Sequence, residues 1–417
     1  MRWPRPLRCL EHRNLRLFFG GQAVSLVGTW MQSVAQGWLV WRLTHSSAML
    51  GAIAFLAQLP VFLFGAWAGS LADRLPRRTI VLATQLNAVV QAVALAVLTL
   101  GGWVKAWMLL PLAFMLGLTY AFEIPARQAL LGEIAGPDMP NALALNSSVV
   151  NGARIVGPAL AGVLVAAVGE GWAFALNAVS FLGTLRALLV MQVPPFRPAP
   201  RPGGTHLAEG FLWAWRTPVV RALLSLLAVS SVFGMSYVAL LPVLSERVLG
   251  GGPRLFGLLQ SCAGAGALGG GVILMMRGGV AGLERRAALG AAALGGGLFV
   301  VGLSRHPVLS AGALMLAGFG YVTQTAGTMT LLQSLSPPWM RGRMMGLFST
   351  IFVGMTPFGA LAGGFAAARF GVPRTFLAGS SVVLAASAAF HLRLPRPRRG
   401  AAWSGEGGTP GPGAPAR

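Results

Sequence analysis

The stretch of sequence that decides the fold is GSLADRLPRR, residues 69–78. It holds one carboxylate, Asp73, beside three arginines. The segments on either side, residues 48–68 and 79–103, contain no charged residue, and each is long enough to cross about 30 Å of hydrocarbon as a helix. The sequence around this stretch therefore predicts two membrane-spanning helices joined by a short basic loop.

The composition of the whole chain fits a membrane protein. Of its 417 residues, 55% are hydrophobic and only 10% are charged, whereas about a quarter of a soluble chain is charged. A net charge of +22 would suggest nucleic acid as the partner of a soluble domain. With a mean hydropathy of +0.68, it instead indicates loops held at an anionic membrane surface. We therefore expect a lipid bilayer, and no nucleic acid, around this chain.

The residue types needed for catalysis or cofactor binding are not clustered in the sequence. Cys9 and Cys262 cannot make a disulfide framework, and no Cys/His spacing resembles a metal site. The single lysine, Lys105, is not in a Walker A loop. No Ser/His/Asp or paired-carboxylate group emerges. The sequence predicts no enzyme, no cofactor, no metal and no ATP binding by this chain.

Apolar windows of spanning length recur along the chain in two groups of six. They fall at 17–41, 48–68, 79–103, 106–125, 143–168 and 172–192, then at 219–243, 255–276, 287–304, 308–331, 344–368 and 372–391. We expect an all-α membrane protein of twelve transmembrane helices in two pseudo-symmetric six-helix bundles. Its organisation is then a basic cytoplasmic amino-terminal segment (1–16), one bundle (17–192), a Pro/Gly/Arg-rich cytoplasmic linker (193–218), a second bundle (219–392) and a disordered cytoplasmic tail (393–417).

The orientation follows from the distribution of basic residues. Twenty-two of the thirty-two lie in the termini and the even-numbered gaps between spans, six lie in the odd-numbered gaps, and Arg154, Arg186, Arg221 and Arg374 lie within the windows. Because basic loops stay on the cytoplasmic side, both termini are expected in the cytoplasm.

The two halves resemble each other. Three glycines of the fifth window recur 202 positions later in the eleventh, which is the spacing of equivalent spans in a duplicated chain: Gly157, Gly162 and Gly169 match Gly359, Gly364 and Gly371.

The 69–78 stretch resembles the signature loop of the major facilitator superfamily at every defined position, carried here by Gly69, Leu71, Asp73, Arg74, Arg77 and Arg78. The resemblance implies that Asp73 docks on a helix start in the opposite half and holds a cytoplasmic gate shut in one state. A carboxylate at a helix start gains about 0.3–1 kcal/mol, which suits a contact that must also release. We expect Gly69 to let two helices approach closely.

In the fifth window, Gly157, Pro158 and Gly162 partly match the Gly-Pro helix motif of the superfamily's antiporters. Generic packing of a membrane helix is the alternative reading. Three longer stretches narrow the resemblance to the drug:proton antiporter branch that includes macrolide-efflux and enterobactin-exporter-like proteins: EIPARQALLGEIAG (123–136), NALALNSSVVNGARIVGPALAG (141–162) and RGRMMGLFSTIFVGMTPFGALAGG (341–364).

This resemblance implies a monomeric secondary transporter in the bacterial inner membrane. It would export a small amphipathic molecule, such as a drug, macrolide or siderophore-like compound, in exchange for protons. An importer or lysolipid flippase of the same fold, and a receptor or enzyme, are the alternatives.

One acidic residue, Glu123, falls inside a predicted span. Arg127 follows it by one helical turn, and Arg154 in the next span is expected at a similar depth. A pair of Glu123 with either arginine is the candidate protonation switch, and a static ion pair that ties two helices together is the alternative.

Polar side chains also recur at helical spacing on the first, fourth and tenth spans, which line the central cavity in this superfamily. The candidates for the cavity wall are Gln32, Gln36, Tyr120, Tyr321 and Gln324, and hydrogen bonding between helices is the alternative for these polar residues. Trp38 and Trp41 are expected in an interfacial belt.

Overall fold

The computed structural model describes residues 5–193, 207–276 and 282–393, and every regular element in these ranges is helical. The expected tail beyond residue 393 and half of the expected linker, residues 194–206, lie outside the described residues. The first six long helices are α1 (Arg13–Thr44), α2 (Ser47–Ala72), α3 (Arg77–Leu100), α4 (Leu109–Ala135), α5 (Met139–Val168) and α6 (Glu170–Val190). Short 3-10 turns precede α1 (Arg5–Glu11), α4 (Ala106–Met108) and α5 (Gly136–Asp138).

The second half repeats this pattern with two interrupted spans. Its seventh span is composite, with α8 (Pro218–Val229) and α9 (Tyr237–Val243) each followed by a π-helical turn, η4 (Ser230–Gly234) and η5 (Leu244–Val248). The remaining helices are α10 (Pro253–Met276), α11 (Leu283–Leu303), α12 (Pro307–Leu335), α13 (Arg341–Gly354), α14 (Thr356–Phe370) and α15 (Val372–Arg393). Helices α13 and α14 together form the eleventh span.

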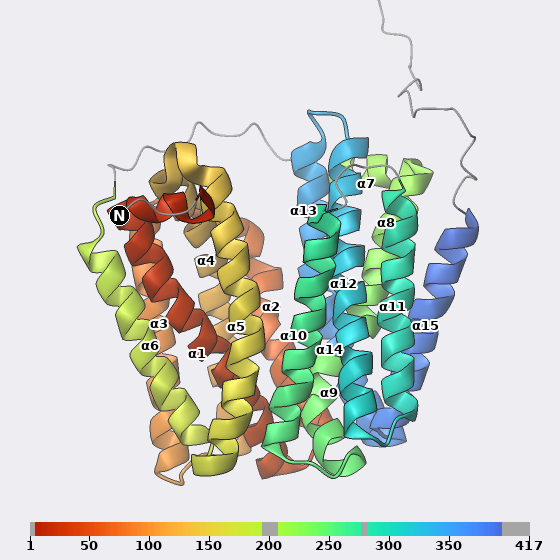
Figure 1. Ribbon diagram of the computed structural model, residues 1–417, viewed down its shortest axis with the longest axis horizontal. Helices are drawn as coiled ribbons and strands as arrows, with labels where there is room; N and C mark the ends of the chain where they lie inside the picture. Colours follow the sequence, from red (N-terminus) through yellow and green to blue (C-terminus); the bar gives the residue numbers. More distant parts are fainter. Residues whose placement is uncertain (1–4, 194–206, 277–281, 394–417) are drawn as a thin grey trace, which may run out of the picture.

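The fold class is confirmed: twelve spans form two six-helix bundles side by side (Figure 1). Ten segments are long and apolar enough to cross a membrane by composition alone; one of them, 106–168, holds both α4 and α5. Helix α1 is the twelfth, and it is more polar. Several helices run beyond the predicted windows, because a helix can continue into the aqueous region where the hydrocarbon ends.

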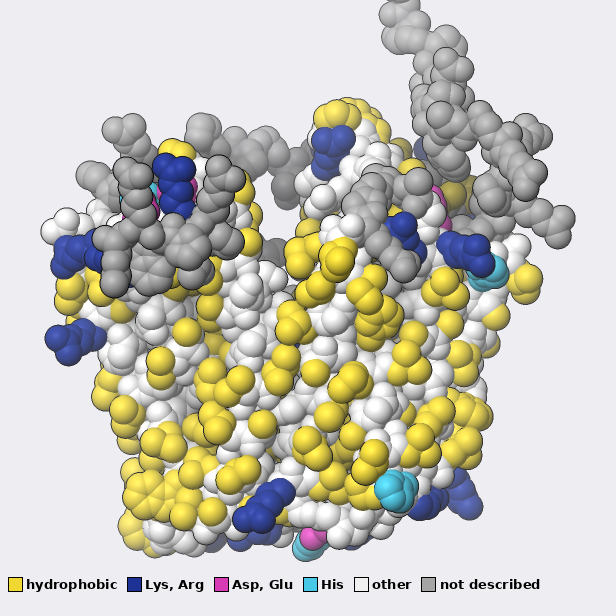
Figure 2. Space-filling model, in the orientation of Figure 1, with side chains coloured by type: hydrophobic (Ala, Val, Ile, Leu, Met, Phe, Trp, Pro, Cys, Tyr) yellow, Lys and Arg dark blue, Asp and Glu magenta, His cyan; other side chains and the backbone are white. Residues whose placement is uncertain are grey.

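The beginning of α1 and the end of α15 lie at the same end of the molecule (Figure 1). We call it the termini end and its opposite the far end. Apolar side chains cover the middle of the visible face, and arginines gather toward the two ends (Figure 2). This distribution suits a protein surrounded by lipid.

The glycines that repeat in sequence occupy equivalent places in the two bundles. A Cβ at Gly157 would come within 2.5 Å of Trp30 on α1, and one at Gly359 would collide with the backbone of Val232 in the seventh span. The next pair, Gly162 and Gly364, faces the opposite bundle instead, as the following paragraph describes. The third pair, Gly169 and Gly371, ends α5 and α14 with φ of 88° and 84°. The glycines of the internal repeat therefore make equivalent helix-packing contacts in the two bundles.

The seam between the bundles consists of two such helix pairs. Helix α5 packs on α10, where a Cβ at Gly162 would lie 2.9 Å from the carbonyl oxygen of Pro253. Helix α14 packs on α2, where a Cβ at Gly364 would lie 2.7 Å from the carbonyl oxygen of Ser47. Small residues on both sides let these backbones touch, as in other membrane helix pairs. Above this seam the two bundles separate, and Figure 2 shows the surface hollowed between them at the termini end.

The part of the linker that the structure describes includes a ten-residue amphipathic helix, α7 (Leu207–Arg216). Its Glu209 pairs with Arg343 of α13 at 2.6 Å. Phe211 and Trp215 are more than half exposed, and their rings stack 6.0 Å apart. The end of the linker is therefore anchored on the second bundle.

Candidate functional site

The loop between α2 and α3 leaves its carboxylate free. Asp73 caps the end of α2, is exposed, and makes no side-chain hydrogen bond or ion pair with another described residue. Arg74 is exposed as well. The space around Gly69 is also open, since a Cβ there would meet no atom within 4 Å. The expected close helix approach at Gly69 is therefore absent in this conformation.

The other two arginines of the loop hold it to its own bundle. Arg77 pairs with Glu133 near the end of α4, and Arg78 donates a hydrogen bond of 2.9 Å to the carbonyl oxygen of Leu189 in α6. The loop is thus fixed at its base while Asp73 remains available to a partner.

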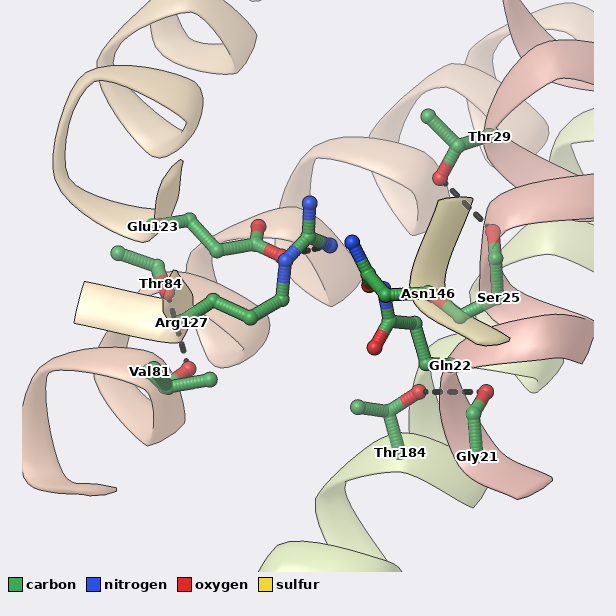
Figure 3. A network of polar contacts seen from close by, with 10 residues as sticks. All are labelled: Gly21, Gln22, Ser25, Thr29, Val81, Thr84, Glu123, Arg127, Asn146 and Thr184. Atoms are coloured by element: carbon green, nitrogen blue, oxygen red, sulfur yellow. Dashed lines mark hydrogen bonds and ion pairs between the residues drawn. The ribbon is translucent and has the colours of Figure 1, made fainter. Parts of the chain in front are cut away.

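Glu123 and Arg127 form an ion pair inside the amino-terminal bundle. Nη1 of Arg127 lies 3.1 Å from Oε1 of Glu123, one helical turn away on α4. The Glu123 side chain is 8% exposed and that of Arg127 is 25% exposed. Figure 3 shows both side chains directed toward Gln22 and Asn146. Of the two pairings that the sequence left open for Glu123, the structure contains the one with Arg127.

A small cavity of about 20 Å³ adjoins this pair. Its walls come from α1, α3, α4 and α6, and they include Gln22, Ser25, Gln85, Glu123 and Arg127. One Gln22 nitrogen donates to Asn146 Oδ1 at 3.0 Å. The side-chain oxygens of Gln22 and Gln85 are buried without a hydrogen-bond partner. A cavity of this volume has room for one water molecule, and its walls combine these polar side chains with apolar ones such as Phe18 and Val81.

Arg154 does not meet Glu123. Its guanidinium carbon lies 5.4 Å from the centre of the Trp30 ring, and no described residue forms a hydrogen bond or ion pair with it. Arg154 is near the middle of α5, about 20 Å from either end of the helix. An arginine at mid-membrane costs about 2.5–3.5 kcal/mol on insertion scales, and one cation–π contact offsets about 0.5–2 kcal/mol of that cost.

The polar stripe of α1 faces the interior of its own bundle. Gln32 is 1% exposed; its nitrogen donates to Gln91 on α3, and its oxygen accepts from Asn177 on α6, both at 2.8 Å. Gln22 and Ser25 line the internal cavity described above. The expectation that Gln32 lines the space between the bundles therefore disagrees with the structure. Gln36 is 5% exposed.

The other cavity candidates lie at two separate places. Tyr120 is half-buried and close enough to Glu123 and Arg127 to interact with their charges. Tyr321 on α12 stacks on Phe352 of α13, with ring centres 5.8 Å apart. Gln324, one turn further along α12, is fully buried and donates to the carbonyl oxygen of Leu226 at 3.3 Å.

The Gly-Pro stretch of α5 lies in two interfaces at once. Gly157 packs on α1, and both Gly162 and the carbonyl oxygen of Pro158 contact Gly257 of α10. These positions therefore sit where the fifth span touches both bundles. Packing accounts for their small size.

The far end is closed by contacts that the sequence did not predict. Trp41, expected in an interfacial belt, is 1% exposed, and its indole donates to the Glu246 carboxylate across the seam. Arg247 lies 4.8 Å from the centre of the same ring. Within the first bundle, Arg42 forms a two-point ion pair with Glu170, at 2.7 and 3.2 Å. Trp38 is also buried, stacked 6.4 Å from Phe256.

Two pseudo-symmetric six-helix bundles, a signature loop after the second span and polar groups at mid-membrane define a transporter of the major facilitator superfamily. The chain belongs to the family of transmembrane secretion effectors, whose model matches residues 5–405.

Individual relatives agree with this family. The chain is 28% identical to the multidrug efflux pump Tap of Mycolicibacterium fortuitum, over 84% of this chain and 88% of that protein. It is 27% identical to the enterobactin exporter EntS of Salmonella choleraesuis, over 89% and 90%. Its fold is similar to the crystal structure of a bacterial homologue of the human lysosomal transporter Spinster in an inward-facing, unoccupied conformation (TM-score 0.68, 16% identity, 91% of this chain and 96% of that one). The chain is thus a multi-pass membrane protein related to efflux transporters.

Proposed function

We propose that this protein exports a small amphipathic molecule from the cytoplasm in exchange for protons, by alternating access between its two bundles. Both termini and the linker are then cytoplasmic, and the hollow at the termini end is the cytoplasmic entrance. The efflux relatives support export, and the basic termini end supports this orientation.

The observation that carries the proton coupling is the buried Glu123–Arg127 pair beside a cavity large enough for one water molecule. Glu123 is the one acidic residue that falls inside a predicted span, so a coupled proton carried by a side chain of the membrane interior would bind its carboxylate. Because the pair lies inside one bundle, the proton binds at a different place from the transported molecule, which binds between the bundles. The rocking movement of the bundles then couples the two binding events.

At each end of the transporter, one contact between the bundles closes that end in one state of the cycle. In the structure the far end is closed by Trp41 and Glu246, while the Asp73 loop at the termini end is disengaged. In the opposite state we expect Asp73 to bind a helix start of the second bundle and the far-end contact to break.

Efflux assays test the proposal. A bacterial host that lacks its own drug pumps should become resistant to part of a panel of drugs, macrolides and siderophore-like compounds when it expresses the chain. An uncoupler should abolish the resistance-linked efflux. Accumulation of the same compounds inside the cells would instead identify an importer. Efflux that persists in the presence of the uncoupler would show that protons do not drive transport.

A further inference from the structure

We infer that Arg154, together with Tyr237 and Tyr321, binds an anionic group of the transported molecule at the middle of the membrane. The preferred substrate is then a carboxylate or other oxyanion carried on a flat apolar body. This inference deepens the proposed transport function and rests on it.

The position of Arg154 between the bundles is the first argument. It is carried by α5 of the first bundle, its side chain lies over Trp30 of α1, and its backbone touches Gly264 of α10 in the second bundle. The side chain is half-buried. Tyr237 of α9 and Tyr321 of α12 are both close enough to interact with its charge. Helices of both bundles therefore meet around one guanidinium.

The missing counter-charge is the second argument. Among the described residues none pairs with Arg154, and the one carboxylate near mid-membrane, Glu123, is occupied by Arg127. The ring of Trp30 faces the guanidinium but supplies no negative charge. A guanidinium has five N–H donors arranged to bind oxyanions. A ligand oxyanion would supply the partner that the chain does not.

The aromatic surroundings give the third argument. Tyr321 stacks on Phe352, and Phe352 stacks on Phe348 with ring centres 5.5 Å apart. This column of rings belongs to α12 and α13 of the second bundle. A flat apolar body could lie against these rings while its oxyanion reaches Arg154 and the tyrosine hydroxyls donate to the same oxygens.

The site also suits a carrier. Arg154 belongs to one bundle and the two tyrosines belong to the other, so rocking of the bundles changes their separation. An anion that bridges them is held firmly in one arrangement and released as they part. A ligand can shift such an equilibrium because it binds the two arrangements with different affinity.

A matched pair of probes tests the charge requirement. The full-length protein in nanodiscs of zwitterionic lipid is equilibrated at pH 8 with 2-naphthoate or with its neutral isostere 2-naphthamide, and binding is measured by equilibrium dialysis against empty nanodiscs. We expect naphthoate to bind at least about tenfold more tightly, the effect of one charge-assisted hydrogen bond. A ratio near one, or no measurable naphthoate binding, overturns the inference.

Variants then locate the charge. Arg154→Gln should abolish the naphthoate preference and Arg154→Lys should keep most of it. Tyr321→Phe should weaken naphthoate binding a few-fold and leave the affinity for naphthamide unchanged. This variant tests the inference if Arg154→Gln does not fold. The matched control is Arg186→Gln, because Arg186 is an exposed arginine within α6. A preference that survives in folded Arg154→Gln contradicts the inference. Binding is measured without a gradient, so failure of efflux in cells would instead count against the transport function.

Discussion

The indole N–H of Trp41 in the amino-terminal bundle donates a hydrogen bond to the carboxylate of Glu246 in the carboxyl-terminal bundle. The guanidinium of Arg247 lies over the face of the same indole ring. Together they join the bundles at the far end.

Trp41→Phe should therefore favour opening of the far end. The variant keeps an aromatic ring but loses the hydrogen bond to a charged group, which is worth about 1.5–3 kcal/mol. Such a loss shifts the closed-to-open ratio at least about tenfold. Spin labels at Lys105→Cys and His306→Cys, one on each bundle near the far end, should show a longer distance by electron–electron resonance. Phe256→Leu, which alters the nearby ring contact of Trp38 but no hydrogen bond, is the control; equal distances in Trp41→Phe and wild type would contradict this prediction.

Asp73→Asn should impair transport while leaving membrane insertion and expression nearly intact. Asp73 is exposed and has no side-chain partner among the described residues, so stability should change by less than about 0.5 kcal/mol. The state in which it docks should be weakened, because the amide carries no charge for a helix start. Rates of efflux, normalised to the amount of inserted protein, decide the matter. Wild-type rates in Asp73→Asn would rule out a gating role for this residue.

Glu123→Gln should abolish uphill export and retain substrate binding. The amide mimics the protonated carboxyl and cannot release a proton, while its shape preserves the packing of α4. Export against an imposed pH gradient in proteoliposomes is the measurement. Glu209→Gln, which removes an exposed carboxylate that also pairs with an arginine, is the matched control. Uphill export by Glu123→Gln with the pH dependence of the wild type would make Glu123 a static ion-pair residue.

Both termini should be reached by reagents from the cytoplasm alone. In a Cys9→Ala, Cys262→Ala background, a cysteine at Ser404 should react with a membrane-impermeant maleimide only after the cells are opened. A cysteine at Lys105, in an odd-numbered gap, should react in intact cells. The reverse labelling pattern would show that the termini end faces away from the cytoplasm. The hollow at that end would then open to the outside of the cell.

Gly364→Val should disrupt the α14–α2 half of the seam. The new side chain would meet the carbonyl oxygen of Ser47 and the backbone of Gly51, which cannot yield without moving a helix. Overpacking of this kind costs about 1–3 kcal/mol. The apparent melting temperature in detergent should fall, whereas Gly312→Val, at a glycine of α12 with no atom within 4 Å of its Cβ position, should leave it nearly unchanged. Similar melting curves for the two variants would show that the seam is looser than the structure indicates.

The sequence predicts the twelve spans and the two bundles because hydrophobic length and loop charge are local properties. It also places Glu123 and Arg127 together, since residues one turn apart on a helix must be neighbours. It fails where the neighbour belongs to another helix. The spacing of Gln32 on α1 shows which residues share its face, but the direction of that face, toward Gln91 and Asn177, is set by tertiary packing. The contact of Arg154 with Trp30 and the burial of Trp41 were hidden for the same reason.

The glycine-lined seam has a consequence for the speed of the transporter. Between the described residues, two hydrogen bonds cross from one bundle to the other: Trp41 to Glu246, and Ser261 to the carbonyl oxygen of Ile155. The rest of the seam is contact between small residues, backbone and aromatic rings, together with the cation–π contact of Arg247 on Trp41, and such contacts weaken gradually as surfaces slide. Few directional bonds therefore have to break together when the bundles rock. The activation enthalpy of the empty carrier should be modest, and its return stroke should depend only weakly on temperature.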